Sequence, residues 1–147
     1  MTYSAVEHLA LLKPFQQTTV DYVFRRLFTD KSPTDQFLVA DEVGLGKTMV
    51  ARGVIAKTIE HLLGKVDRID IVYICSNQAI AEQNIKSLNV LGSATKPLNT
   101  RLTLLPLEIE KEGGIASRPI NLISLTPGTA LVSIGVQSGT PPFCQTA

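Results

Sequence analysis

The chain has 147 residues, of which 44% are hydrophobic and 18% are charged, a balance that fits a folded globular domain better than an intrinsically disordered chain. Its formal net charge of +1 excludes an overall basic field for nucleic acid, so such binding would need a local patch. Two cysteines are too few for a disulfide framework, which favours reduced thiols in the cytoplasm. No uncharged apolar run reaches the roughly 20 residues that span a bilayer, so we expect a cytoplasmic protein with no membrane partner.

The first 30 residues predict a helical segment. Residues 7–12 predict a short helix, and Pro14 opens a second helix that runs to residue 28, because proline is tolerated in a first helical turn. Apolar residues recur along this second helix near the helical spacing. A loop is predicted at residues 29–35, where Pro33 interrupts the pattern.

A strand, a glycine-bearing loop and a helix are predicted next. Residues 36–40, Gln-Phe-Leu-Val-Ala, form a short apolar run that predicts a buried parallel strand. The glycine-bearing loop, residues 41–48, comes directly after this strand. A helix is predicted from Lys47 to about residue 63, with Gly64 as its C-terminal cap.

Strands and helices continue to alternate beyond that helix. Residues 69–74 predict a second buried strand, after which Ser76 or Asn77 caps a further helix. Residues 101–104 and 120–125 predict a third and a fourth strand. This order predicts an α/β fold in which helices flank a parallel sheet.

The loop 41–48, Asp-Glu-Val-Gly-Leu-Gly-Lys-Thr, predicts a phosphate-binding site for ATP with Mg²⁺. Its end matches the general pattern Gly-x₄-Gly-Lys-Ser/Thr, whereas Asp41 stands where the first glycine is usual. Lys47 would place a cation beside the phosphates, Thr48 would offer a hydroxyl to Mg²⁺, and the helix dipole would attract the anion. Asp41 and Glu42 are interpreted as acids that stabilise the loop. The residues expected to hold the nucleotide are Val43, Gly44, Leu45, Gly46, Lys47, Thr48 and Met49.

The same loop resembles motif I of superfamily 2 helicases, in particular the Swi/Snf-type DNA translocases. The resemblance implies a RecA-like P-loop NTPase fold, ATP hydrolysis coupled to movement along DNA, and a catalytic role for Lys47 and Thr48. Residues 12–16, Leu-Lys-Pro-Phe-Gln, resemble the upstream glutamine motif of that family. By this resemblance Gln16 recognises adenine and Phe15 helps to pack the site.

Two further segments resemble motifs that contact the nucleic-acid backbone in the same family. Residues 72–77 resemble motif Ia, and residues 124–129 resemble a later motif of the first lobe. The resemblance implies that DNA or RNA is contacted by six residues of these segments: Ser76, Asn77, Thr126, Pro127, Gly128 and Thr129. The same residues also fit plainer roles, as a helix cap at 76–77 and as a Pro-Gly turn at 127–128.

Two parts of the family pattern are missing. These ATPases use an Asp-Glu pair at the end of a later strand, but no aspartate follows Asp70. Residues 107–110, which alternate like an exposed strand edge, are a poor substitute. The second lobe with its arginine finger is also absent, so a partner chain or a missing C-terminal portion would have to supply it. We therefore expect little hydrolysis by this chain alone.

The resemblance divides the chain into three parts. A helical segment with the glutamine motif covers residues 1–30, an incomplete ATP-binding lobe covers 31–129, and an uncharged tail covers 130–147. Two other functions stay open on the sequence alone. One is a small P-loop kinase, which would need an acceptor site, and the other is a non-catalytic nucleotide-binding module that serves for interaction.

Overall fold

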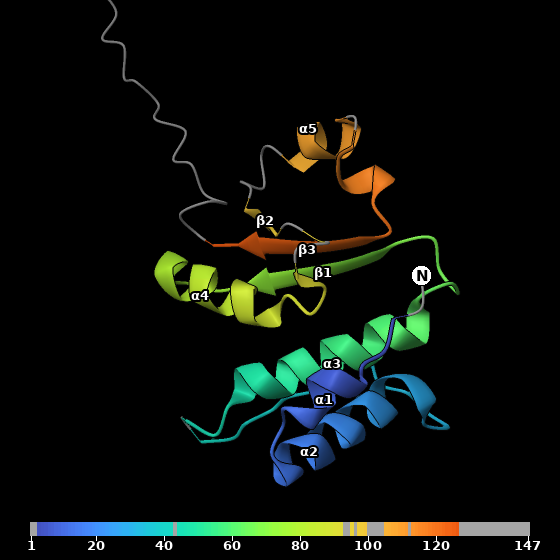
Figure 1. The fold of residues 1–147 in the computed structure, drawn as a ribbon, viewed down its shortest axis with the longest axis vertical. Coiled ribbons are helices and arrows are strands. Elements are labelled where there is room, and N and C mark those ends of the chain that lie inside the picture. The colour runs from blue at the N-terminus through green and yellow to red at the C-terminus, as the bar shows by residue number, and fades with distance from the viewer. Residues whose placement is uncertain are drawn as a thin grey trace, which may run out of the picture.

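The computed structural model describes residues 3–42, 44–92, 95, 97–99, 105–111 and 113–126. The predicted strand at 101–104 and the tail at 130–147 lie outside these residues. The elements are α1 (Val6–Ala10), α2 (Pro14–Phe24), the π-helical turn η1 (Arg25–Thr29), α3 (Lys47–Leu62), β1 (Ile69–Ile74), α4 (Gln78–Leu88), β2 (Leu98–Asn99), α5 (Leu105–Glu110), the 3₁₀ turn η4 (Ile115–Ser117) and β3 (Ile120–Leu125) (Figure 1).

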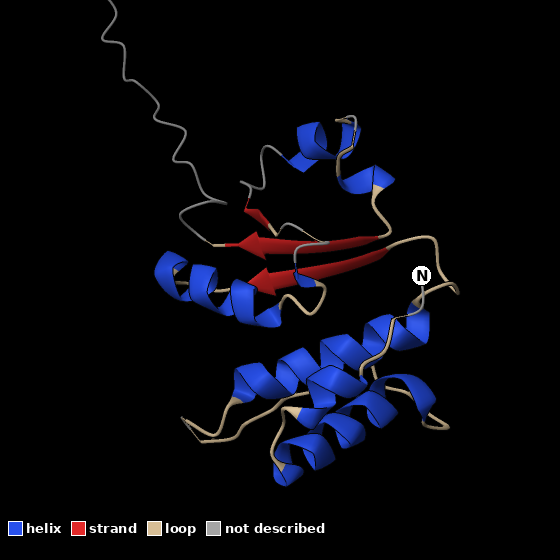
Figure 2. Cartoon of the chain, viewed as in Figure 1, coloured by secondary structure: helices blue, strands red, loops and turns tan. Residues whose placement is uncertain are grey.

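The sheet is parallel and has the order β1-β3-β2. β1 and β3 pair over six residues each, from Ile69 opposite Ile120 to Ile74 opposite Leu125, and the short β2 joins the other edge of β3. Helix α4 follows β1 and packs against both long strands. The mixed α/β arrangement predicted from the alternating pattern is confirmed (Figure 2).

Two predicted strands are wrong. Residues 36–40 form no strand and pair with no strand among the described residues, and the sheet consists of β1, β3 and β2 there. Residues 107–110 belong to α5, in which Pro106 occupies the first turn, where its missing N–H leaves no hydrogen bond unmade.

The predicted helices are confirmed, with shifted ends. The first helix covers Val6–Ala10 in place of 7–12, and the second continues beyond Phe24 as the turn η1. Helix α3 ends at Leu62, and Gly64 follows it with φ of 81°, a left-handed backbone conformation that glycine adopts without a steric penalty.

Helices α2 and α3 approach closely because a glycine stands at their contact. A Cβ atom added to Gly53 of α3 would lie 2.7 Å from Val20 Cγ2 and 2.9 Å from Leu12 Cδ1. Val20, Leu12 and Val50 are buried together at this contact. The helical layer made by α1, α2 and α3 therefore has a small core of its own.

A second core connects this helical layer to the sheet. Ala56 and Ile59 of α3 are buried against Ile69 and Ile120, the first residues of β1 and β3. At the same end, Asn121 donates from Nδ2 to Asp70 Oδ1 at 2.8 Å and to the Ile115 carbonyl at 3.0 Å. Among the described residues, no helix has the length and apolar character that crossing a membrane requires.

Candidate phosphate-binding site

Two glycines shape the loop that leads into α3. Gly44 has φ of 91° and Gly46 has φ of 81°, in the left-handed region that side chains other than glycine rarely adopt. Gly46 is the N-cap of α3, and its carbonyl accepts hydrogen bonds from the N–H groups of Met49 at 2.8 Å and Val50 at 3.1 Å. The loop therefore turns sharply and the helix begins at Lys47.

The side chain of Lys47 turns back over the loop. Its Nζ donates to the carbonyl oxygen of Asp41 at 2.7 Å and to that of Glu42 at 2.9 Å. The ammonium group thus lies at the start of the loop, at an exposed position. The backbone carbonyls of Asp41 and Glu42 make these contacts, a role that side-chain patterns in the sequence do not reveal.

Three backbone N–H groups at the start of α3 are positioned to donate hydrogen bonds to a ligand. The N–H groups of Gly46, Lys47 and Thr48 have no acceptor among the described residues. Because α3 is 16 residues long, its dipole adds partial positive charge at this end. Open N–H groups, a helix dipole and a lysine ammonium are the components of an anion-binding site.

Thr48 supplies one oxygen that suits Mg²⁺. Its side chain is half-buried, and its hydroxyl has no hydrogen-bond partner among the described residues. No cluster of three or more His, Cys, Asp or Glu side chains in the described part of the chain has the arrangement of a metal site. Thr48 therefore fits as a single ligand, with phosphate oxygens and water completing the shell that Mg²⁺ prefers.

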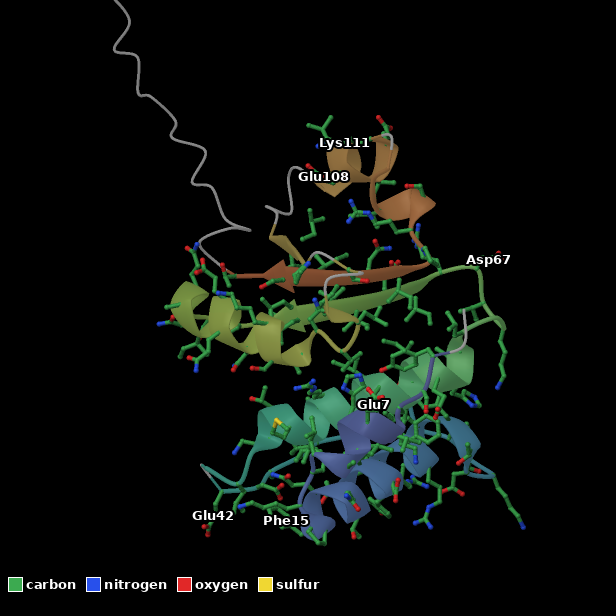
Figure 3. The ribbon with its side chains drawn as sticks, in the orientation of Figure 1. Glu7, Phe15, Glu42, Asp67, Glu108 and Lys111 are labelled. Atoms are coloured by element: carbon green, nitrogen blue, oxygen red, sulfur yellow. The ribbon has the colours of Figure 1, made fainter. Side chains whose placement is uncertain are left out.

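Gln16 is bound to the same loop. It is only 6% exposed, its Oε1 accepts from the Lys13 N–H at 3.0 Å, and its Nε2 donates to the Leu45 carbonyl at 3.0 Å. Figure 3 labels Phe15 and Glu42 at the same end of the molecule, from α2 and the loop respectively. The structure thus brings the glutamine segment and the loop together.

The remaining nucleotide residues differ in their surroundings. Leu45 is exposed, and Met49 is half-buried against the core between α2 and α3. Val43 lies outside the described residues. Only Met49 of these three therefore has a packing role that the structure describes.

The predicted nucleic-acid residues lie at the carboxyl ends of two neighbouring strands. Ser76 and Asn77 follow β1, and Thr126 follows β3, where the Cys75 N–H donates to the Leu125 carbonyl at 3.1 Å. In Figure 1 the amino end of α3 lies at this same end of the molecule. The structure brings these three residues together; the predicted contacts Pro127, Gly128 and Thr129 lie outside the described residues.

Their individual environments are different. Ser76 and Asn77 are exposed, and Asn77 Oδ1 accepts from the Ile80 N–H at 3.1 Å, which confirms the predicted helix cap. Thr126 is only 4% exposed. Tyr73 was not predicted as part of this region; burial raises its pKa, and the Asn84 Nδ2 donates to its hydroxyl at 2.9 Å.

No protein-family model, curated protein or solved structure matches this chain.

Proposed function

We propose that this chain binds ATP with Mg²⁺ through residues 43–49, as the ATP-binding part of a superfamily 2, Swi/Snf-like DNA translocase. The observation that carries the proposal is the position of the Lys47 ammonium, which lies over a loop curled by two left-handed glycines. A lysine that pointed away from an uncurled turn would have opposed it.

Phosphate oxygens take the place of the two carbonyls at Lys47 when the nucleotide binds. Asp41 and Glu42 hold the ammonium through neutral carbonyl oxygens, whereas a phosphate offers charged oxygens, which form stronger hydrogen bonds. The open N–H groups of Gly46, Lys47 and Thr48 then bind the same anion. Thr48 would hold Mg²⁺ through its hydroxyl oxygen, and the ion would neutralise part of the phosphate charge.

In the proposed site, Gln16 fixes the position of the loop through hydrogen bonds. Both ends of its amide already form hydrogen bonds, to the Lys13 N–H and to the Leu45 carbonyl. Recognition of adenine by Gln16 therefore requires that it exchange at least one of these bonds. Nucleotide binding and loop position are coupled through this side chain.

Hydrolysis in the proposed family uses a carboxylate pair on a later strand. No aspartate follows Asp70 in the sequence, so the chain offers no match for the Asp-Glu pair that holds Mg²⁺ and orients the attacking water in these ATPases. The exposed residues Ser76 and Asn77 provide the described part of the DNA-contacting surface in this proposal. The isolated chain is expected to bind nucleotide with little turnover.

Thermal and chemical unfolding with and without ATP and Mg²⁺ test the binding. Ligand at a hundredfold excess over its dissociation constant should raise the free energy of unfolding by about 2.7 kcal/mol. Lys47→Ala should remove this gain, whereas Lys86→Ala, at an exposed position on α4, should retain it. An unchanged unfolding midpoint of the unmodified chain in saturating ATP would overturn the proposal.

Phosphate release measured with and without DNA tests the expected inactivity. We expect no turnover above that of Lys47→Ala under either condition. Turnover that rises with DNA and disappears in Lys47→Ala would contradict the requirement for an Asp-Glu pair, while leaving the nucleotide-binding proposal in place.

A further inference from the structure

Two neighbouring glutamines hold opposite sides of one peptide bond. Gln17 Nε2 donates to the Leu9 carbonyl at 3.0 Å and to the Leu12 carbonyl at 3.1 Å. Gln16 Oε1 accepts from the Lys13 N–H at 3.0 Å. The Leu12 carbonyl and the Lys13 N–H belong to the same peptide bond, so Gln17 holds that bond on one side and Gln16 holds it on the other.

The planarity of this peptide bond makes the two contacts depend on each other. The bond is trans, so its carbonyl and its N–H point in opposite directions from one rigid plane. The Leu12 carbonyl therefore cannot rotate without turning the Lys13 N–H away from Gln16. Because Gln17 holds the carbonyl, it fixes the direction of the N–H that Gln16 accepts.

The chemistry of the partners determines how each amide is turned. Backbone carbonyls only accept hydrogen bonds, so Gln17 must present Nε2 to its two carbonyl partners. By the same reasoning, Gln16 must present Oε1 to the Lys13 N–H and Nε2 to the Leu45 carbonyl. Either amide, turned over, would set an oxygen against a carbonyl oxygen.

Burial strengthens this chain of hydrogen bonds. Gln16 and Leu12 are buried, and Gln17 is half-buried. Hydrogen bonds that follow one another through a peptide group polarise each other, and they are stronger where water is excluded. The Gln16 bond to Lys13 is therefore the firmer of its two bonds, because its other partner, Leu45, lies in the loop between two left-handed glycines.

We propose that Gln17 is a positioning residue that sets the preference of the site for adenine over guanine, an inference that rests on the proposed nucleotide function. The nucleotide base replaces the Leu45 carbonyl at Gln16 Nε2. The bond from Gln16 Oε1 to the Lys13 N–H stays in place, because Gln17 holds the peptide bond from its other side.

An amide held in this way matches adenine. Adenine presents a ring-nitrogen acceptor beside an amino donor, whereas guanine presents two acceptors on the same edge. Nε2 of Gln16 donates to the ring nitrogen, and Oε1, which has a second lone pair, accepts from the amino group. Guanine would set its oxygen against Oε1. An amide that was free to turn over could offer Nε2 to that oxygen, and the preference would weaken.

Dissociation constants for ATP and for GTP, each with Mg²⁺, test the assignment in the full chain. Gln17→Glu keeps the shape of the side chain but replaces its donor with an oxygen. It should reduce the preference for ATP over GTP by about tenfold or more. Gln83→Glu makes the same change at an exposed position on α4 and should retain the preference.

Two further variants separate positioning from stability. Ile85→Val removes a buried methylene group from α4 and should destabilise the chain without changing the preference. Gln17→Lys should retain the preference, because its ammonium group can donate to both carbonyls, as Lys47 does to those of Asp41 and Glu42. A packing role of Gln17 would not predict rescue by a donor of different shape.

Hydrogen exchange at the Lys13 amide tests the positioning without nucleotide. Gln17→Glu should speed this exchange by about tenfold or more, and Gln83→Glu should leave it unchanged. Circular dichroism verifies that each variant is folded. If Gln17→Glu is not folded, Gln17→Ala removes the donor without adding a charge and is expected to give the same two results.

Three results would overturn the inference: unchanged Lys13 exchange without the Gln17 donor, an unchanged preference for ATP in the same variant, or an equal loss of preference in Ile85→Val. Failure of the unmodified chain to bind either nucleotide would overturn the proposed function, and this inference with it. Binding of ATP by the unmodified chain together with any of the three results would overturn this inference alone.

Discussion

The Nε2 atom of Gln16 donates to the carbonyl oxygen of Leu45 at 3.0 Å, across 29 residues of sequence. Through its Oε1 the same amide accepts the N–H of Lys13, just before α2. One buried side chain therefore joins the start of α2 to the loop that precedes α3. A displacement of the loop or of the start of α2 would therefore strain these two hydrogen bonds of Gln16.

Gln16→Ala should destabilise the fold. The substitution removes the partner of the Lys13 N–H and of the Leu45 carbonyl in two part-buried hydrogen bonds, which costs about 1 kcal/mol. Urea unfolding measures the loss. Gln83→Ala, at an exposed position on α4, should change the free energy of unfolding by less than about 0.5 kcal/mol. Equal effects of the two substitutions would show that the Gln16 contacts add nothing to stability.

Gly46→Ala should cost more than Gly64→Ala, although both glycines have φ of 81°. The left-handed backbone penalises alanine by about 1–2 kcal/mol at either site. At Gly46 the new Cβ would also lie 2.5 Å from Gln16 Nε2, whereas at Gly64 nothing lies within 4 Å. Breaking the Gln16 contact should therefore add about 1 kcal/mol at Gly46 alone.

A double variant isolates that extra cost. In a Gln16→Ala background the amide is gone, so Gly46→Ala should cost no more than Gly64→Ala does in the unmodified chain. Strictly additive free energies of unfolding would mean that the two residues are not coupled.

Gly53→Ala should destabilise the contact between α2 and α3. Alanine favours a helix over glycine by about 1 kcal/mol, but overpacking a core costs about 1–3 kcal/mol, and the added Cβ would lie 2.7 Å from Val20 Cγ2. We expect a net loss of about 1 kcal/mol. In a Val20→Ala background the same substitution should become neutral or stabilising, and a loss that persists there would exclude the Val20 contact as its cause.

Stability should fall at alkaline pH through Tyr3. Burial, and then the negative charge of Glu60, raise its pKa from 10.0 to about 12, although Arg52 acts in the opposite direction. Because the folded pKa lies above the ordinary value, this contribution is complete below pH 10 and is lost as the pH rises to about 12.

Chemical unfolding at a series of alkaline pH values measures that loss. Tyr3→Phe should reduce the slope of the free energy of unfolding against pH in this range, whereas Tyr22→Phe, at an exposed site, should not. Tyr3→Phe should also not destabilise the fold at neutral pH, because the Tyr3 hydroxyl is buried with no hydrogen-bond partner among the described residues. Identical slopes for the two variants would contradict the assignment to Tyr3.

The sequence predicts best the elements whose signals are complete within a short stretch. The helix from Lys47, the strands at Ile69–Ile74 and Ile120–Leu125, and the Asn77 cap all follow from local patterns, and the structure has them. A paired strand is different, because it needs a neighbour. Residues 36–40 have the composition of a buried strand, yet no described strand lies beside them to accept their hydrogen bonds.

The site is predictable to a similar degree. Glycine, lysine and threonine in the loop predict a phosphate-binding site, and the structure shows positive φ angles at both glycines and the Lys47 side chain over the loop. The contact of Gln16 with the Leu45 carbonyl could not be predicted, because it joins a side chain to a distant backbone atom. The direction of Lys47 toward Asp41 and Glu42 escapes sequence patterns for the same reason.

The parallel pairing of β1 with β3 sets an order for folding during synthesis. Asp70 and Asn121, which share a hydrogen bond, are 51 residues apart, so β1 leaves the ribosome long before β3, its partner strand among the described residues, does. The contacts among α1, α2 and α3 close earlier, since all of these residues precede β1. The helical layer therefore becomes the platform on which a late, slow-forming sheet assembles.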